Sequence, residues 1–389
     1  MHASYNLRVT GPDTFADASS PVEGGELSSV IAAHIARRGG WLPFDAYMAL
    51  ALYAPGLGYY SRSSRQFGHM PASGSDFVTA PELSPLFGAA LARAVAQALQ
   101  AAGADTVFEF GAGSGALAEQ VLQALGPAVA RYCIVDLSGA LRERQARRLA
   151  RFGAQVQWLD AWPETLHGVV LGNEVLDAMP VQVLHFDGQQ WFERGVACGP
   201  EGLVFEDRPT ALRPPDAARS GPFLPGTVTE IHLQAEAFIR SLAERLQHGA
   251  AFFIDYGFPD AEYYHPQRHQ GTLVAHRAHR TELDAAALLR DPGDKDITAH
   301  VNFSAMALAA QDAGLQVLGY TSQANFLLNC GILDLLPQDD FRATAALQKL
   351  LAEHEMGELF KVLALARGPG FETGFDALGF ARGDRSHTL

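Results

Sequence analysis

The stretch Val107-Phe-Glu-Phe-Gly-Ala-Gly-Ser-Gly-Ala-Leu117 decides how this chain folds. An apolar run ends at Glu109, and Gly111, Gly113 and Gly115 follow at every second position, before a run of helix-forming residues. This order predicts a buried strand, a tight turn and a helix. Glycine lacks a Cβ, so the turn accepts unusual dihedrals and lets a ligand approach the backbone. The helix N-terminus behind it offers free N–H groups to an anionic group.

The glycines alone fit more than one cofactor. Gly111, Gly113 and Ala116 also satisfy the dinucleotide fingerprint G-x-G-x-x-G/A, and a turn that only packs a helix on a sheet is a further possibility. A second apolar run ends at Asp136, about 20 residues on, where a ribose-binding carboxylate is expected. Nicotinamide enzymes usually carry an apolar residue at the position of Glu109, whereas S-adenosylmethionine-dependent methyltransferases favour an acid there. The pattern therefore resembles the first motif of the class I methyltransferases.

Apolar and helical runs alternate through residues 105–367, which predicts a parallel sheet with right-handed crossovers. We therefore expect an α/β fold of the class I methyltransferase type. Its sheet is predicted to be seven-stranded, doubly wound and mostly parallel, with the last strand antiparallel. The ligand of such a sheet binds at the carboxyl ends of the strands.

The chain divides into predicted regions by composition and pattern. A hairpin signature around Asp187-Gly188 marks an antiparallel interruption of the core. The predicted regions are a flexible N-terminus at 1–25, a helical region with a lid at 26–104, the core at 105–367 with an antiparallel insertion at 181–230 and a loop and helical insertion at 258–301, and a flexible tail at 368–389.

Charge and composition exclude some classes of partner. The 389 residues carry 29 basic and 43 acidic side chains, a formal net charge of −14. Such a surface repels phosphate backbones, so no nucleic-acid partner is expected. It suits a cationic substrate or a basic partner surface, or it only keeps the protein soluble.

Cysteine usage and hydropathy bear on the compartment. Cys133, Cys198 and Cys330 are odd in number and far apart, which predicts neither a disulfide framework nor a zinc site and fits a cytoplasmic protein. No signal peptide pattern and no run of 18 apolar residues is present, so no membrane span is expected. The histidines lack a metal-binding spacing, so no metal is expected.

Five further motifs accompany the glycine turn, and they run over residues 74–88, 172–181, 254–257, 296–303 and 356–363. They read GSDFVTAPELSPLFG, GNEVLDAMPV, IDYG, DITAHVNF and MGELFKVL. Together they resemble the MidA family of S-adenosylmethionine-dependent methyltransferases. Mitochondrial members of that family modify an arginine of a subunit of complex I (NADH:ubiquinone oxidoreductase) and assist its assembly. The resemblance implies S-adenosyl-L-methionine as cofactor and a protein arginine as substrate.

Cofactor contacts are predicted from the strand ends. Glu109 is expected to bind the ammonium of the amino-acid tail, or else to brace the glycine turn. Asp136 is expected to accept the ribose hydroxyls, and Asp160 to meet the adenine amino group or to cap a helix. Thr79 belongs to the predicted lid, together with Phe77 and Pro81. The predicted cofactor residues are Thr79, Glu109, Gly111, Gly113, Gly115, Asp136, Asp160 and Asn173.

Candidate catalytic residues follow the fourth and fifth strands: Glu174, Asp177, Asp255 and Tyr256. A guanidinium keeps its proton at neutral pH, and bidentate carboxylates can fix its plane so that one nitrogen faces the methyl carbon. The alternatives are that Asp177 caps a turn, that Glu174 pairs with an arginine, and that Tyr256 only packs against the sheet.

The predicted function is therefore an S-adenosylmethionine-dependent methyltransferase acting on a protein arginine. The rival predictions are a small-molecule methyltransferase, a non-enzymatic assembly factor that keeps the fold, and a nicotinamide oxidoreductase. The two insertions favour a macromolecular partner, and the oligomeric state stays open.

Overall fold

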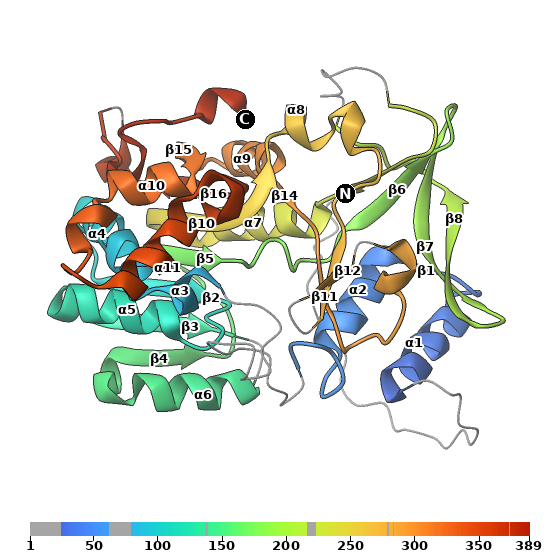
Figure 1. Ribbon diagram of the computed structural model, residues 1–389, viewed down its shortest axis with the longest axis horizontal. Helices are drawn as coiled ribbons and strands as arrows, with labels where there is room; N and C mark the ends of the chain where they lie inside the picture. The colour runs from blue at the N-terminus through green and yellow to red at the C-terminus, as the bar shows by residue number, and fades with distance from the viewer. Residues whose placement is uncertain are drawn as a thin grey trace.

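The structure is a computed structural model, and it describes residues 25–61, 79–136, 139–215, 223–277, 280–282, 284–372 and 374–389. The predicted flexible N-terminus, apart from residue 25, and Phe77 of the predicted lid lie outside these residues. Figure 1 shows two bodies side by side, a larger one built on the main sheet and a smaller one that contains the N-terminal helices. None of the described helices is long and apolar enough to cross a membrane.

The main sheet is mixed and mostly parallel, as predicted. In spatial order its strands are β15 (Gln316–Ser322), β16 (Phe360–Arg367), β10 (Leu246–Phe258), β5 (Leu166–Asn173), β2 (Thr106–Phe110), β3 (Arg131–Val135) and β4 (Val156–Leu159). Only β16 runs against its neighbours β10 and β15. The two-residue β14 (Val301–Asn302) pairs with the end of β10, so the sheet holds eight strands where the sequence predicted seven.

Helices cover both faces of this sheet, because its strands are apolar on both sides. Alternate residues of β2 face opposite ways, so Val107 joins one core and Phe108 the other. The helices on the side of Val107 are α4 (Pro85–Ala102), α5 (Ala116–Leu125), α10 (Gln323–Asn329) and α11 (Phe341–Leu351). Those on the side of Phe108 are α7 (Leu233–Arg245) and α9 (Phe303–Asp312).

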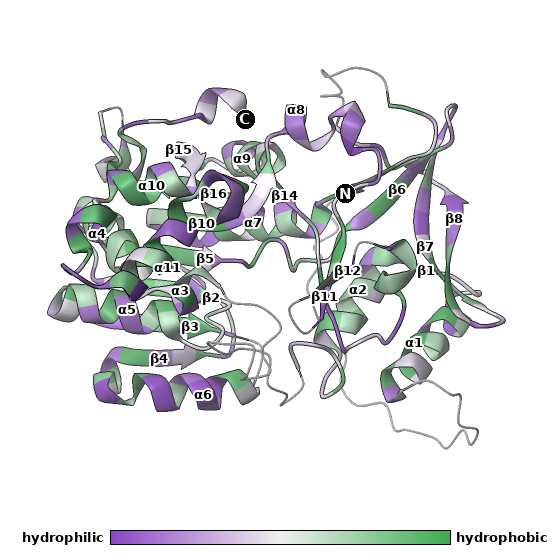
Figure 2. Cartoon of the chain, viewed as in Figure 1, coloured by the Kyte–Doolittle hydropathy of each residue, from purple (hydrophilic) through white to green (hydrophobic). Residues whose placement is uncertain are grey.

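The first insertion forms a second, antiparallel sheet. Its strands are β6 (Gln182–Phe186), β7 (Trp191–Gly199), β8 (Gly202–Pro209) and β9 (Thr227–Ile231), joined by β1 (Leu42–Pro43) from the N-terminal region. The helices α1 (Glu26–Arg37) and α2 (Phe44–Tyr53) share a buried core with this sheet. The outermost strand β8 is largely hydrophilic (Figure 2). The N-terminal region is therefore not only helical, since β1 extends the sheet of the insertion.

The second insertion differs from the loop and helical segment that the sequence predicted. It contains the short helix α8 (Asp260–Tyr263) and a three-stranded antiparallel sheet. The strands are β11 (Val274–Arg277), β12 (Arg280–Glu282) and β13 (Asp296–Thr298). Strands of three or four residues with many charged side chains show no alternating pattern, so periodicity could not reveal them.

Residues 368–389, predicted to be a flexible tail, pack against the main body instead. Phe371 and Phe380 are buried in the core formed by α4, α10 and the sheet. The N–H of Arg385 donates to the carbonyl of Tyr320 in β15, and the Arg385 guanidinium pairs with Glu358. The short 3₁₀ turns of this segment leave no helical or strand period in the sequence, so periodicity could not predict its packing.

The packing of the tail leads to a stability prediction. Phe371→Ala removes a ring that is 1% exposed and should lower the free energy of unfolding by about 3–5 kcal/mol, the usual cost of deleting a buried aromatic side chain. Phe341→Ala is the matched control, because its ring is 85% exposed. Urea unfolding followed by circular dichroism measures both, and equal midpoints for the two variants would show that the tail does not contribute to the core.

Candidate functional site

The glycine loop joins β2 to α5 in the conformation that the sequence predicted. Gly111, Gly113 and Gly115 have φ angles of 63°, 54° and 81°, which side chains with a Cβ rarely adopt. A Cβ on Gly111 would lie 3.0 Å from a methyl group of Val175, so that position is also sterically closed. At the carboxyl end of β2, Gly111 is exposed and Gly113 is half-buried, whereas Gly115 is buried.

A buried glutamine holds this loop to the next two strands. Gln145 of α6 (Gly139–Leu149) donates from Nε2 to the Gly113 carbonyl at 3.0 Å and to Asp136 Oδ2 at 2.8 Å. Its Oε1 accepts from the Trp158 indole at 2.9 Å. Gln145 was not among the residues predicted from the sequence. The usable signal was its spacing, since it lies four positions before Leu149 and therefore on the same helix face as that buried residue.

Glu109 lies beneath the loop, and the neighbouring strand β3 holds it. The Tyr132 hydroxyl donates to Glu109 Oε2 at 2.8 Å, and the Glu109 side chain is buried. Burial raises the pKa of Glu109 to about 8, and the charge of Asp136 adds to this shift. A hydrogen bond between two strands thus fixes Glu109 beside the glycine turn. The sequence predicted that Glu109 either braces this turn or binds the ammonium of the cofactor.

A second buried contact fixes the segment before the core against the same loop. Ser114 donates a short hydrogen bond to Glu82 of α3 (Ala80–Leu83). Arg148 pairs with Glu82 at 2.7 Å and with Glu119 at 2.8 Å. Thr79, a predicted cofactor contact, is the residue that precedes α3, so it lies at the edge of this arrangement.

Asp160, a predicted adenine contact, lies at the surface of the protein. Its side chain is 92% exposed and pairs with Arg142 at 2.6 Å. The same guanidinium donates to the carbonyls of Leu159 and Asp136, so it closes the ends of β3 and β4. In this structure Asp160 faces solvent at the rim of the site.

The carboxyl end of β5 turns sharply because of one carboxylate of β10. Asp255 Oδ2 accepts from the N–H groups of Val175, Leu176 and Asp177 at 3.2, 2.9 and 3.3 Å. Glu174 lies at the head of this turn with a φ of 53°, an uncommon conformation for a residue with a Cβ. The Asp255 carboxylate thus positions the turn by binding the backbone N–H groups of that turn. The sequence had placed Asp255 among the catalytic side chains.

Three carboxyl groups meet at this turn. Burial and the charge of Asp177 raise the pKa of Glu174 to about 8, and burial raises the pKa of Asp177. Burial and both neighbours hold the pKa of Asp255 well above its ordinary value. Among the described residues no Lys or Arg pairs with any of the three. Asp177 Oδ1 and Asn173 Oδ1 are buried without a hydrogen-bond partner within the described part of the chain.

Tyrosines line the same place. Tyr256 lies close enough to Asp177 to feel its charge, and its ring meets the ring of His300 edge-on with centroids 5.1 Å apart. From the N-terminal region, Tyr53 donates to the Ala178 carbonyl at 2.8 Å and stacks on Tyr60 with ring centroids 5.6 Å apart. The core and the N-terminal region thus meet at the carboxylate turn.

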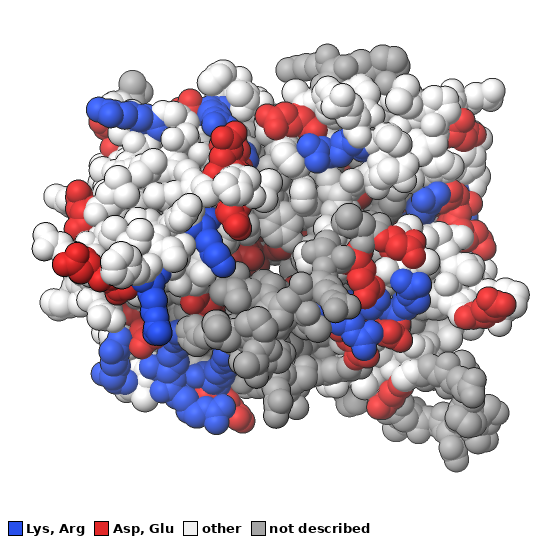
Figure 3. All heavy atoms as spheres, viewed as in Figure 1, with Lys and Arg blue, Asp and Glu red and all other residues white. Residues whose placement is uncertain are grey.

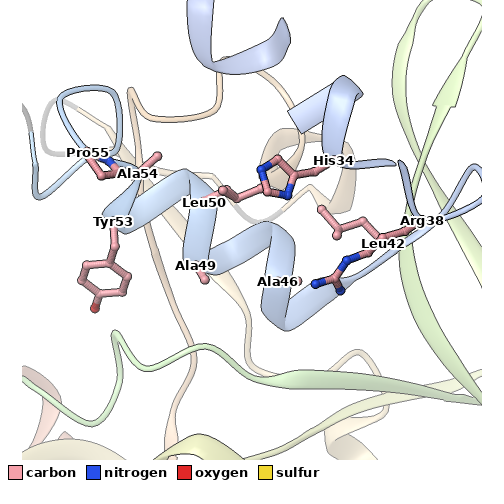
Figure 4. A pocket seen from close by; sticks show the side chains of 9 residues that line it. All are labelled: His34, Arg38, Leu42, Ala46, Ala49, Leu50, Tyr53, Ala54 and Pro55. Carbon is pink, nitrogen blue, oxygen red and sulfur yellow. The ribbon is translucent and has the colours of Figure 1, made fainter. Parts of the chain in front are cut away.

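A hollow of about 280 Å³ lies elsewhere, between α1 and α2. His34 and Arg38 stand at one end of it and Tyr53 at the other (Figure 4). Its walls are mainly apolar, and none of the buried carboxylates of the turn lines it. We therefore place the candidate site at the glycine loop and the carboxylates.

Charge is distributed unevenly on the surface. Lys and Arg gather over α6 on the face that Figure 3 shows, although the net charge of the chain is −14. Within the part of the chain that the structure describes, no group of three His, Cys, Asp or Glu residues is arranged to hold a metal ion.

The family comparison agrees with the geometry of the loop. Residues 90–321 match the family model described as "Putative S-adenosyl-L-methionine-dependent methyltransferase". A crystal structure from Burkholderia thailandensis, bound to S-adenosyl-homocysteine, is 51% identical and superposes with a TM-score of 0.87 over 95% of this chain and 100% of the other. The methyltransferase class and the cofactor inferred from the sequence are thereby confirmed.

Curated relatives bear on the target and the compartment. The zebrafish and human proteins named "Protein arginine methyltransferase NDUFAF7, mitochondrial" are 27% and 28% identical. The matches cover 82% and 94% of this chain and 82% of each relative. The cytoplasmic location predicted from the sequence is contradicted, because these relatives are mitochondrial proteins.

The contacts of Gln145 predict a variant with weak cofactor binding. Gln145→Ala removes the donors to Asp136 and to the Gly113 carbonyl, and should weaken S-adenosyl-homocysteine binding by about 1.5–3 kcal/mol, the range for hydrogen bonds to charged groups. Calorimetry measures the affinity. Gln123→Ala, an exposed glutamine of α5, serves as the control. Equal affinities for both variants would remove Gln145 from the cofactor site.

Proposed function

The chain belongs to the family of S-adenosyl-L-methionine-dependent methyltransferases, and we propose that it methylates an arginine of a protein partner. The observation that carries this proposal is the buried carboxylate turn, which has no Lys or Arg partner among the described residues. Relatives named as protein arginine methyltransferases support the same target. The MidA resemblance makes a subunit of NADH:ubiquinone oxidoreductase the first candidate partner.

The residues at the glycine loop fit the cofactor. Gly111, Gly113 and Gly115 hold the left-handed backbone of a tight turn, in which the amino-acid and ribose parts of the cofactor can approach the main chain. Asp136, oriented by Gln145, offers a carboxylate for the ribose hydroxyls. Glu109 is buried too deeply against Tyr132 to be an open ligand, so we assign it the support of the loop.

The carboxylate turn fits a guanidinium better than it fits a neutral group. Buried acids that raise one another's pKa are costly, and a cation placed between them offsets that cost. Asp177 Oδ1 has no hydrogen-bond partner within the described residues, and Glu174 Oε1 accepts from the Asn173 amide at 3.1 Å. Two carboxylates can hold a planar guanidinium by paired hydrogen bonds and present one nitrogen.

The bound cofactor supplies a methyl group on a sulfonium, which leaves as a neutral thioether. The carboxylates orient the attacking nitrogen in line, so most of the acceleration comes from positioning. The attacked nitrogen must also lose a proton. Glu174, with its pKa raised to about 8, is matched to accept that proton near neutral pH. Asp255 and Tyr256 position this pair through the backbone and through Asp177.

The experiment that tests the function is transfer of a radiolabelled methyl group into a mitochondrial protein extract. Mass spectrometry of the labelled protein identifies the residue. Label on arginine supports the proposal, whereas label confined to small molecules would make the protein a small-molecule methyltransferase.

The two carboxylates predict a loss of turnover without a loss of cofactor. Glu174→Gln and Asp177→Asn keep the shape and remove the charge, so methyl transfer should fall by about 100-fold or more, or roughly 3 kcal/mol of transition-state stabilisation. Cofactor affinity by calorimetry should change little. Glu164→Gln, on the exposed surface, is the control. Parent-like turnover in both site variants would leave the carboxylates with a structural role only.

The pKa of Glu174 predicts a pH dependence. Its pKa is raised to about 8 by burial and by the charges of Asp177 and Asp296, so the group is largely protonated at neutral pH in the free enzyme. Only the ionised form holds a cation or accepts a proton, so kcat/KM should rise with pH through this value. A bound guanidinium lowers the pKa, so the midpoint for kcat should lie at lower pH. A profile that Glu174→Gln leaves unchanged would assign the titration to another group.

A further inference from the structure

A buried ion pair connects the segment before the core to the middle of the glycine loop. Ser114 lies between Gly113 and Gly115 and is 4% exposed. Arg148 of α6 donates from Nη1 to the Ser114 hydroxyl at 2.7 Å and to Glu82 Oε1 of α3 at 2.7 Å. The Ser114 hydroxyl in turn donates to the same Glu82 oxygen. These three side chains form a closed triangle, so a shift of one breaks its contacts with both others.

We propose that Arg148 is a positioning residue for the cofactor. Its guanidinium holds the glycine loop through Ser114, and α3 through Glu82, in the arrangement that binds S-adenosyl-L-methionine. Arg148 acts through these two residues and not on the methyl group itself. The inference concerns the cofactor, so it does not depend on which substrate is methylated. None of the three residues was among those predicted from the sequence.

One face of α6 holds successive residues of the loop. Gln145 lies three positions before Arg148, so both side chains leave the helix on the same face. Gln145 donates to the Gly113 carbonyl at 3.0 Å, and Arg148 donates to the next residue, Ser114. Gly115 also lies against α6, since a Cβ there would be 3.5 Å from Cγ of Gln145. The conformation of the loop is therefore set by contacts with this helix.

The other end of the triangle fixes Thr79, a predicted cofactor contact. Glu82 belongs to the single turn of α3, and its N–H donates to the Thr79 carbonyl at 3.0 Å. The N–H of Leu83 donates to the same carbonyl at 3.0 Å. Thr79 is thus bound into the first turn of α3, and its position follows that of Glu82. The loop and the segment before the core therefore take their relative position from Arg148.

Burial makes this contact depend on a charged partner. The Glu82 side chain is 4% exposed, and a buried carboxylate is costly unless a cation or several donors hold it. A guanidinium carries five N–H donors in one plane, so it can serve three acceptors at once. The third acceptor is Glu119 of α5, which accepts from Arg148 Nε at 2.8 Å. A neutral side chain at position 148 would bury Glu82 without this ion pair.

The partners of Glu119 separate the loop from the packing of the helices. Arg151, just after α6, pairs with Glu119 at 3.2 Å and donates to Gln123 at 3.0 Å. Both of these partners lie on α5, beyond the glycine loop. Arg148 and Arg151 thus share one carboxylate of α5, and Arg148 extends that contact to Ser114. A change at Arg151 should disturb the helices and leave the loop in place.

A further contact keeps α3 attached when the triangle is broken. Gln120 of α5 donates to the Pro81 carbonyl at 2.6 Å and accepts from the Gly88 N–H at 2.9 Å. A Cβ on Gly88 would lie 2.4 Å from the amide oxygen of Gln120, so this contact requires glycine. Substitution of Arg148 should therefore shift the loop end of α3 without detaching the segment, and the variants should fold.

Calorimetry with S-adenosyl-homocysteine tests the inference on the full chain. Arg148→Met removes the charge and the donors, so the affinity should fall by about 10-fold or more. Arg148→Lys keeps a cation that can donate to Glu82 and Ser114, so it should bind at least about threefold more tightly than Arg148→Met. Ser114→Ala removes the link to the loop alone and should cost about three- to tenfold. Arg151→Met is the matched control and should stay within about twofold of the parent.

The same titrations distinguish positioning from packing. Arg148→Met combined with Ser114→Ala should lose no more affinity than Arg148→Met alone, because both changes break the same link. Parent-like affinity in Arg148→Met, losses that add in the double variant, or an equal loss in Arg151→Met would each overturn the inference. Circular dichroism checks the fold of every variant. Should Arg148→Met fail to fold, Ser114→Ala decides alone, and parent-like affinity in that variant overturns the inference.

Discussion

The carboxylate of Asp255 is the contact on which the rest of the site depends. It accepts three consecutive backbone N–H groups after β5, at residues 175–177. That bend holds Glu174 in its left-handed conformation and sends the Asp177 side chain toward Tyr256. It also aims two carbonyls outward, one at Tyr53 and one at the second insertion. A single buried acid thereby joins the core to both neighbouring segments.

This arrangement has an electrostatic cost that no ion pair to a described lysine or arginine offsets. Asp255 is stabilised by its backbone donors, but Glu174 and Asp177 face it and each other, and burial raises the pKa of all three. A fold selected for stability alone would place apolar residues at such positions. Buried acids that lie beside a glycine loop, and that no described Lys or Arg pairs with, are instead expected where a cation must be held during reaction.

The sequence predicted the parts of the site that depend on local pattern. The strand, glycine turn and helix around Gly113, and the acids that end β5, follow from residues close together in the chain. The hydrogen bond between Tyr60 and Asp296 joins residues 236 positions apart, and no local period announces it. The pairing of Asp160 is a second contact that local pattern did not predict. Asp160 follows β4 as expected, but Arg142 draws it to the surface, and a strand-end rule cannot foresee that pairing.

Contacts between residues close in the chain and contacts between distant segments lie in different parts of the candidate site. Gln145 holds the cofactor loop through Gly113 and Asp136, 32 and 9 positions away, all within the first half of the core. The carboxylate turn contacts the N-terminal region and the second insertion, which share a separate hydrophobic core. Mutations in that smaller core can therefore move Tyr60 and Asp296 without disturbing the glycine loop. The glycine loop and the contacts of the carboxylate turn with its neighbours thus rest on different hydrophobic cores.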